Sequence, residues 1–189
     1  MGPMTLRGAV WIAWLPALAL AGCGSGGAAK PDGAASMHDA DFSVCSGTPA
    51  VPYAPGMSVV SASGTYRAAV QTAVTVDNAG GSTATAGIGK ATFTVAVSAG
   101  SDGGAAAPTD GLTMSIPPSP SQVPADPYMP VHKHGASFSP TITSQGAGLF
   151  TVADIDFFMG GYWQLYLDLL PAGATAADRV TFEICIPND

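Results

Sequence analysis

Two of the chain's three histidines, His132 and His134, lie two residues apart in a short segment that begins with Met129 and Pro130. On a β-strand, residues two apart face the same way, with Cα atoms about 6.5–7 Å apart. This spacing predicts that both imidazole rings can reach one metal ion. Met129 precedes a proline, which favours an extended backbone, so its thioether is a third candidate ligand.

A further thioether, that of Met159, lies later in the chain between Phe157 and Trp163. Imidazole suits copper, zinc and nickel, whereas thioether sulfur selects for Cu(I). A ligand set of His132, His134, Met129 and Met159, with no carboxylate in the motif, therefore predicts a copper site.

The same residues also have a purely structural interpretation. Methionine side chains often pack against aromatic rings, so Met129 and Met159 can belong to a core built around Trp163. In that case His132 and His134 bond to loop carbonyls, and the segment is a turn in a protein that binds no metal. Spacing does not decide between the two interpretations.

The N-terminus has the features of a processed export signal. Arg7 gives a short positive region, and the apolar run from Ala9 to Leu20 is too short to span a bilayer. It ends in Leu20-Ala21-Gly22-Cys23, which resembles the bacterial lipobox. We therefore expect a lipoprotein signal peptide over residues 1–22 and acylation of Cys23, which would anchor the chain in a membrane. The alternative is an ordinary secretory signal with an incidental cysteine.

The residue after Cys23 predicts where the anchored chain resides. It is Gly24 rather than aspartate. By resemblance to the sorting rule of enterobacterial lipoproteins, we expect a cell-envelope protein in the outer membrane, facing the periplasm.

Composition excludes some functions. The formal net charge is −7 and charged residues make up only 10% of the chain, so no basic surface is available to bind nucleic acid. The 24 glycines and 16 prolines disfavour long helices.

The mature chain divides into two parts. Residues 23–40 are rich in glycine, alanine and serine and predict a flexible tether, in which His38 is solvated. From residue 41 to 189, apolar residues recur with a period of two between turn residues, which is typical of roughly six or seven short strands. We expect an all-β fold, an immunoglobulin-like antiparallel β-sandwich. The alternating runs are Tyr66–Val76, Phe93–Val97, Leu112–Ile116, Phe150–Met159, Trp163–Leu169 and Val180–Ile186.

Cys45 and Cys185 remain once Cys23 is acylated. An even number of cysteines in an exported chain predicts a disulfide. A thiolate metal site or a redox pair is the competing interpretation, although no Cys-x-x-Cys motif is present.

The segments around the histidines resemble the YtkA-like domain, which is related to the FixH family. The resemblance covers roughly residues 64–186 and is strongest from Tyr128 to Leu169. It implies an exported or membrane-anchored immunoglobulin-like sandwich. It also implies metal or copper handling, with a copper-handling or oxidase-assembly protein as partner. The segments that carry it are Met129-Pro-Val-His132-Lys-His134-Gly135, Gly148-Leu-Phe150 and Phe157-Phe-Met159-Gly160-Gly-Tyr-Trp163.

The chain departs from the family pattern in two places. Phe150 stands where tyrosine is usual, and the loops from Ala99 to Pro127 are longer than expected. The surroundings of the site can therefore differ from those in the family.

No motif points to an enzyme. The sequence has no Gly-x-Ser-x-Gly elbow, zinc-protease helix or phosphate-binding loop. Asp154 and Asp156 fit an exposed strand face better than an acid–base pair. We therefore expect a lipoprotein that carries or buffers copper, or alternatively a structural or interaction module without metal.

Overall fold

The computed structural model describes residues 41–100, 109–117, 127–136 and 139–188. The predicted signal peptide, the tether and Cys23 lie outside the described residues, so their predictions stay untested. Among the described residues, no helix is long and apolar enough to cross a membrane.

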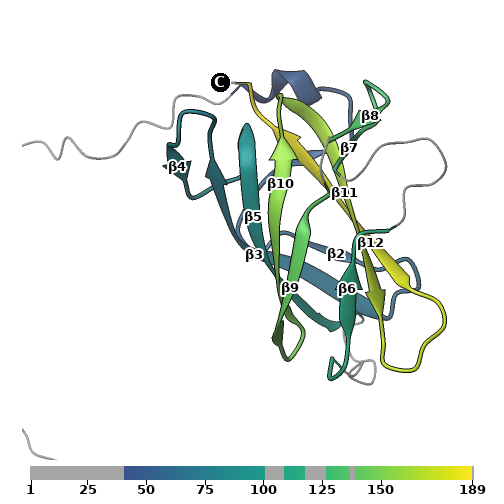
Figure 1. Ribbon diagram of the computed structural model, residues 1–189. Helices are drawn as coiled ribbons and strands as arrows, with labels where there is room; N and C mark the ends of the chain where they lie inside the picture. Colours follow the sequence, from purple (N-terminus) through teal and green to yellow (C-terminus); the bar gives the residue numbers. More distant parts are fainter. Residues whose placement is uncertain (1–40, 101–108, 118–126, 137–138, 189) are drawn as a thin grey trace, which may run out of the picture. The chain divides into compact units, whose positions relative to one another are not determined.

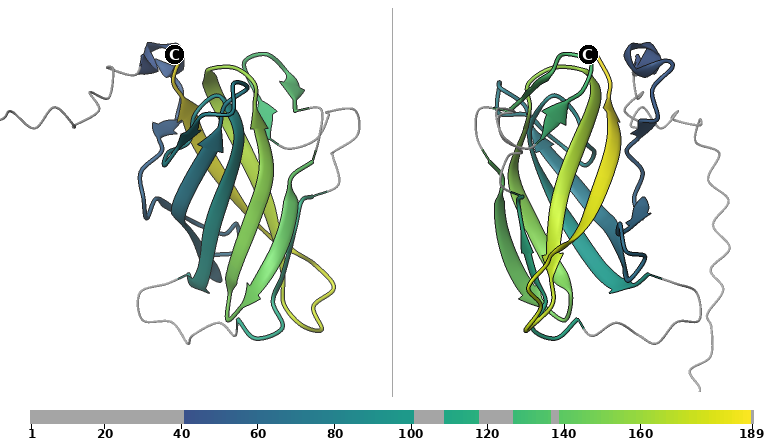
Figure 2. Two further views of the ribbon diagram at one scale, coloured as in Figure 1. Left: turned by 60° about the vertical axis from the view of Figure 1, so that its left-hand side comes forward. Right: turned by 90° about the vertical axis from the view of Figure 1, so that its right-hand side faces the viewer.

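Two sheets pack against each other, and every strand pairing but one among the described residues is antiparallel (Figures 1 and 2). The first sheet has the order β1 (Val51–Pro52), β12 (Asp178–Ile186), β11 (Gly161–Leu170), β7 (Tyr128–Met129) and β8 (His134–Gly135), and β6 (Thr113–Ser115) also pairs with β11. The second has the order β2 (Ser58–Val60), β3 (Tyr66–Val76), β5 (Gly89–Ala99), β10 (Leu149–Phe157) and β9 (Thr141–Gly146), with β4 (Ser82–Thr83) on β3. The exception is β1, which runs parallel to β12.

The core lies between the sheets and follows the alternation of the long strands. Successive side chains of a strand point to opposite faces, so every second residue is buried. Burying one large apolar side chain contributes about 1.5–3 kcal/mol, which makes this interior the main source of stability. The largest fully buried side chains include Phe93, Phe150, Phe157, Trp163, Leu165, Leu167, Leu169, Phe182, Ile184 and Ile186.

The predicted antiparallel β-sandwich is confirmed, and each of the six alternating runs forms a strand: β3, β5, β6, β10, β11 and β12. Of the remaining strands, only the histidine segment, which contains β7 and β8, was expected to be extended. Most have only two or three residues, which is too few to show a period. Strand β9 has a single apolar residue, Ile142, in six.

The predicted disulfide between Cys45 and Cys185 is also confirmed, with a Cα–Cα distance of 6.0 Å. It joins η1 (Phe42–Cys45), a single 3-10 turn, to strand β12. Asp41 caps η1 by accepting a hydrogen bond from the Ser43 amide, and its carbonyl accepts another from the Asn188 amide. The first and last described segments are therefore held together by one covalent bond and one backbone bond.

Candidate metal-binding site

The histidines lie in a tight hairpin between β7 and β8. Met129 pairs directly with His134, and four loop residues, Pro130 to Lys133, connect them. The Lys133 amide donates a 2.8 Å hydrogen bond to the Met129 carbonyl, and Lys133 has a φ of 57°. A left-handed residue at this point lets so short a loop reverse the chain.

The expectation that both histidines face one way along a strand is therefore wrong. Only His134 belongs to β8, whereas His132 lies in the loop. Spacing of two residues predicts a shared face only where the backbone is extended, and here the chain reverses between Met129 and His134.

The turn nevertheless brings the two imidazoles together. Their ring centroids are 5.6 Å apart, with an angle of 42° between the planes. Two imidazoles bound to one ion have centroids roughly 5–6 Å apart, because each metal–nitrogen bond is about 2.0–2.1 Å long. His132 is exposed and His134 is partly buried, so an ion between them can be reached from solvent.

Met129 lies on the buried side of this pair. Residues directly opposite in an antiparallel pair point to the same face, with Cβ atoms about 4.5–5.5 Å apart, so Met129 and His134 are side-chain neighbours. Met129 is only 1% exposed. A Cβ atom added at Gly161 would lie 2.5 Å from its terminal methyl group. Met129 is thus a core residue as well as a candidate ligand.

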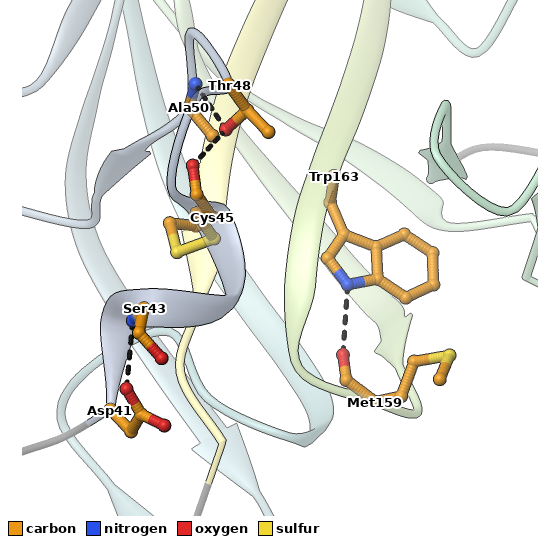
Figure 3. The surroundings of a disulfide bond; sticks show 8 residues. Asp41, Ser43, Cys45, Thr48, Ala50, Met159 and Trp163 are labelled. Carbon is orange, nitrogen blue, oxygen red and sulfur yellow. Dashed lines mark hydrogen bonds between the residues drawn. A yellow bond between two sulfur atoms is a disulfide. The ribbon is translucent and has the colours of Figure 1, made fainter.

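Met159 is held in place by the core. It lies in the turn that carries the chain from β10 in one sheet to β11 in the other. The indole N–H of the fully buried Trp163 donates a 3.0 Å hydrogen bond to the Met159 carbonyl (Figure 3). The Met159 side chain extends alongside the indole, and it is partly buried against the core (Figure 3).

The same turn contacts the histidine hairpin through Phe158. Its ring stacks on that of His134, with centroids 5.4 Å apart and an angle of 26° between the planes. The loop that carries His132 and the turn that carries Met159 therefore meet at one end of the sandwich. Of the four predicted residues, Met129 and His134 are paired directly, His132 adjoins His134, and Met159 is next to the residue stacked on His134.

Phe158 was not predicted as part of this site. Phe158 directly follows the buried Phe157, the last residue of β10, so it lies in the turn, where strand alternation does not predict its direction. The sequence does place Phe158 directly before Met159, a candidate ligand, and this adjacency is the signal by which Phe158 could have been included in the site.

No cysteine, carboxylate or further histidine of the described residues joins His132 and His134 in a ligand group. In the described part of the chain, no three or more His, Cys, Asp and Glu residues are grouped so that they could hold a metal ion. Among these residues, the thioethers of Met129 and Met159 are therefore the soft ligands that remain as candidates beside His132 and His134. Nitrogen and thioether ligands together favour Cu(I).

No family model, no curated protein and no solved structure matches the chain. The resemblance to YtkA-like domains stays a prediction, and the function must be argued from the residues themselves.

Proposed function

We propose that this chain is a cell-envelope lipoprotein whose β-sandwich binds one copper ion at the hairpin of His132 and His134. The observation that supports this proposal most strongly is the 5.6 Å separation of the two imidazole rings. It lies within the range that two rings sharing one ion adopt.

The ligand set favours a role in holding copper. His132 and His134 supply two nitrogens, Met159 is the accessible thioether, and Met129 is a second thioether on the core side. In the part of the chain that the structure describes, no carboxylate or cysteine joins the two histidines in a group that could hold a metal ion. The proposed activity is therefore to carry or buffer the ion, with a copper-handling or oxidase-assembly protein of the envelope as partner.

The proposed attachment explains where such a carrier would work. Acylation of Cys23 would fix the chain to the membrane, and residues 24–40 would let the sandwich move roughly 20–25 Å from its anchor. This part of the proposal depends on the sequence alone.

Copper titration of the purified full-length chain, in detergent and under both oxidising and reducing conditions, tests the function. We expect binding of one ion that is lost in the His132→Ala/His134→Ala variant. His38→Ala, which removes the third histidine, is the matched control and should bind as the original chain does. Binding should also weaken between about pH 7.5 and pH 5, because only neutral imidazole ligates a metal.

A second candidate function is a structural or interaction module without metal. It is favoured by the stacking of His134 on Phe158, which gives this histidine a packing role of its own. If this alternative holds, the original chain and the double variant will show the same copper binding, or none. The double variant would then differ only in stability.

A further inference from the structure

Phe158 has an unusual environment for an exposed aromatic residue. It is 43% exposed, yet its ring contacts two others. It stacks on His134, and it meets the Trp163 indole nearly at a right angle, with ring centroids 5.3 Å apart. Trp163 in turn lies edge-on to His134 at 6.5 Å. The His134 imidazole thus has two aromatic neighbours, with the Phe158 ring stacked on it and the Trp163 indole edge-on to it.

The turn that carries Phe158 is fixed from both sides. On one side, the Trp163 indole bonds to the Met159 carbonyl. On the other side, Gly160 lies so close to the Asn188 side chain that an added Cβ atom would collide with the amide oxygen. Asn188 is itself bonded to Asp41, so the turn lies between the Trp163 indole and a C-terminal segment that is tied to η1.

We propose that Phe158 is a specificity-determining residue that makes the hairpin site select Cu(I) over Cu(II) and Zn(II). This inference rests on the copper site proposed above. It adds that the selection comes from a side chain that does not ligate the ion, because the phenyl ring excludes water from one side of the site.

The physical reason is the different solvation of the ions. Zn(II) and Cu(II) complete a shell of four or more ligands and readily use water or carboxylate oxygen. Near the hairpin, the described residues offer no carboxylate in a ligand group, and the apolar ring of Phe158 lies against one side of His134. Cu(I) carries one charge and binds stably with fewer, softer ligands. Its binding is therefore weakened least where water and carboxylate ligands are scarce. An apolar shell of this kind also sets the reduction potential of a bound metal.

The test measures the dissociation constants for Cu(I), Cu(II) and Zn(II) on the full-length chain. Phe158→Ala removes the ring, and Phe158→Gln replaces it with a smaller side chain that carries polar atoms. We expect either variant to bind Cu(I) about three- to tenfold more weakly, as expected for loss of one aromatic contact. Binding of Cu(II) and Zn(II) should be unchanged or tighter, and the Cu(II)/Cu(I) reduction potential should fall.

Two further variants separate selectivity from a general effect on folding. Phe158→Tyr keeps the ring and should retain the Cu(I) preference. Phe42→Ala removes another phenylalanine of similar exposure, 37%, which lies on η1, and should leave all three constants unchanged.

The outcomes distinguish this inference from the copper proposal. If the original chain binds Cu(I) through its histidines and both Phe158→Ala and Phe158→Gln keep its ratio of Cu(I) to Cu(II) affinity, the role of Phe158 is wrong and the copper site stands. If the original chain binds Cu(I) no better than the His132→Ala/His134→Ala variant, both proposals are wrong. A folded variant that loses the preference supports both.

Discussion

His134 connects the protein's interior with its proposed ligand site. On one side it pairs across the hairpin with the buried Met129, and on another it stacks on Phe158. His132 lies 5.6 Å away in the loop and is exposed. One ring is therefore held by packing while the other is free to adjust, an arrangement suited to capturing and releasing an ion.

Apart from the histidines, a cluster of hydrogen-bonded polar side chains lies on the outer face of β11 and β12. The Tyr162 hydroxyl donates a 2.7 Å hydrogen bond to the Glu183 carboxylate and accepts one from Gln164. Burial of the ring, followed by the bond to Glu183 and the charge of Glu183, raises the pKa of Tyr162 well above its usual range. Each effect disfavours the phenolate.

This raised pKa predicts a loss of stability in alkali. The folded chain keeps the Tyr162 proton where the unfolded chain releases it, so the stabilisation is complete below the ordinary tyrosine pKa of about 10 and declines above it. We expect the free energy of unfolding to fall between about pH 9 and pH 11, measured by denaturant titration. Tyr162→Phe should show a shallower fall and, near neutral pH, a cost of about 0.5–1.5 kcal/mol for the lost bond. An equally steep fall in both proteins would refute the assignment to Tyr162.

At the scale of elements, the long strands were predictable and the hairpin was not. Trp163, Leu165 and Leu167 alternate along β11 and share one face. This alternation predicts both that the segment is a strand and which of its faces points to the core. Strands β7 and β8 have two residues each and no period. Their position depends on the left-handed backbone conformation of Lys133, which cannot be predicted from the fact that the residue is a lysine.

Gly161 brings the start of β11 against Met129, and so joins the turn that carries Met159 to the hairpin that carries the histidines. It begins β11 with a φ of 135°, and a Cβ atom there would press on the methyl group of Met129. We expect Gly161→Ala to lower the free energy of unfolding by about 1–3 kcal/mol, because the backbone becomes strained. Displacement of Met129, the cross-strand neighbour of His134, should also weaken copper binding.

Gly87→Ala is the matched control for this substitution. A Cβ atom at Gly87 meets nothing within 4 Å, and its φ is not positive. Denaturant unfolding of both variants would settle the point, since equal stabilities would show that Gly161 is not under this constraint.

At the scale of the whole molecule, the fold class and the disulfide could be predicted because each depends on global properties. Alternation over residues 41–189 predicts two half-buried sheets. The predicted export signal and the predicted acylation of Cys23 leave two cysteines, which predicts their pairing. The site could be predicted only in part. Which residues meet at the end of a sandwich depends on how loops return, and Phe158 reaches His134 through such a turn.

The Cys45–Cys185 bond should dominate the response of the whole molecule to reduction. It closes a loop with a sequence separation of 140 residues, for which chain entropy predicts up to about 4–5 kcal/mol. We expect the Cys45→Ser/Cys185→Ser variant to lose about 2–5 kcal/mol of unfolding free energy, measured in denaturant. It should also lose its sensitivity to dithiothreitol. An unchanged unfolding midpoint would mean that the bond contributes nothing to stability.

X-ray absorption spectroscopy of the Cu(I)-loaded full-length chain tests the central claim most directly. We expect two imidazole nitrogens at about 2.0 Å and a sulfur shell at a longer distance, near 2.3 Å as for other metal–sulfur bonds. His132→Ala should remove one imidazole from the spectrum, and Met159→Leu should reduce the sulfur shell. A spectrum with no imidazole contribution, or one that His132→Ala and His134→Ala leave unchanged, would contradict a copper site at the hairpin.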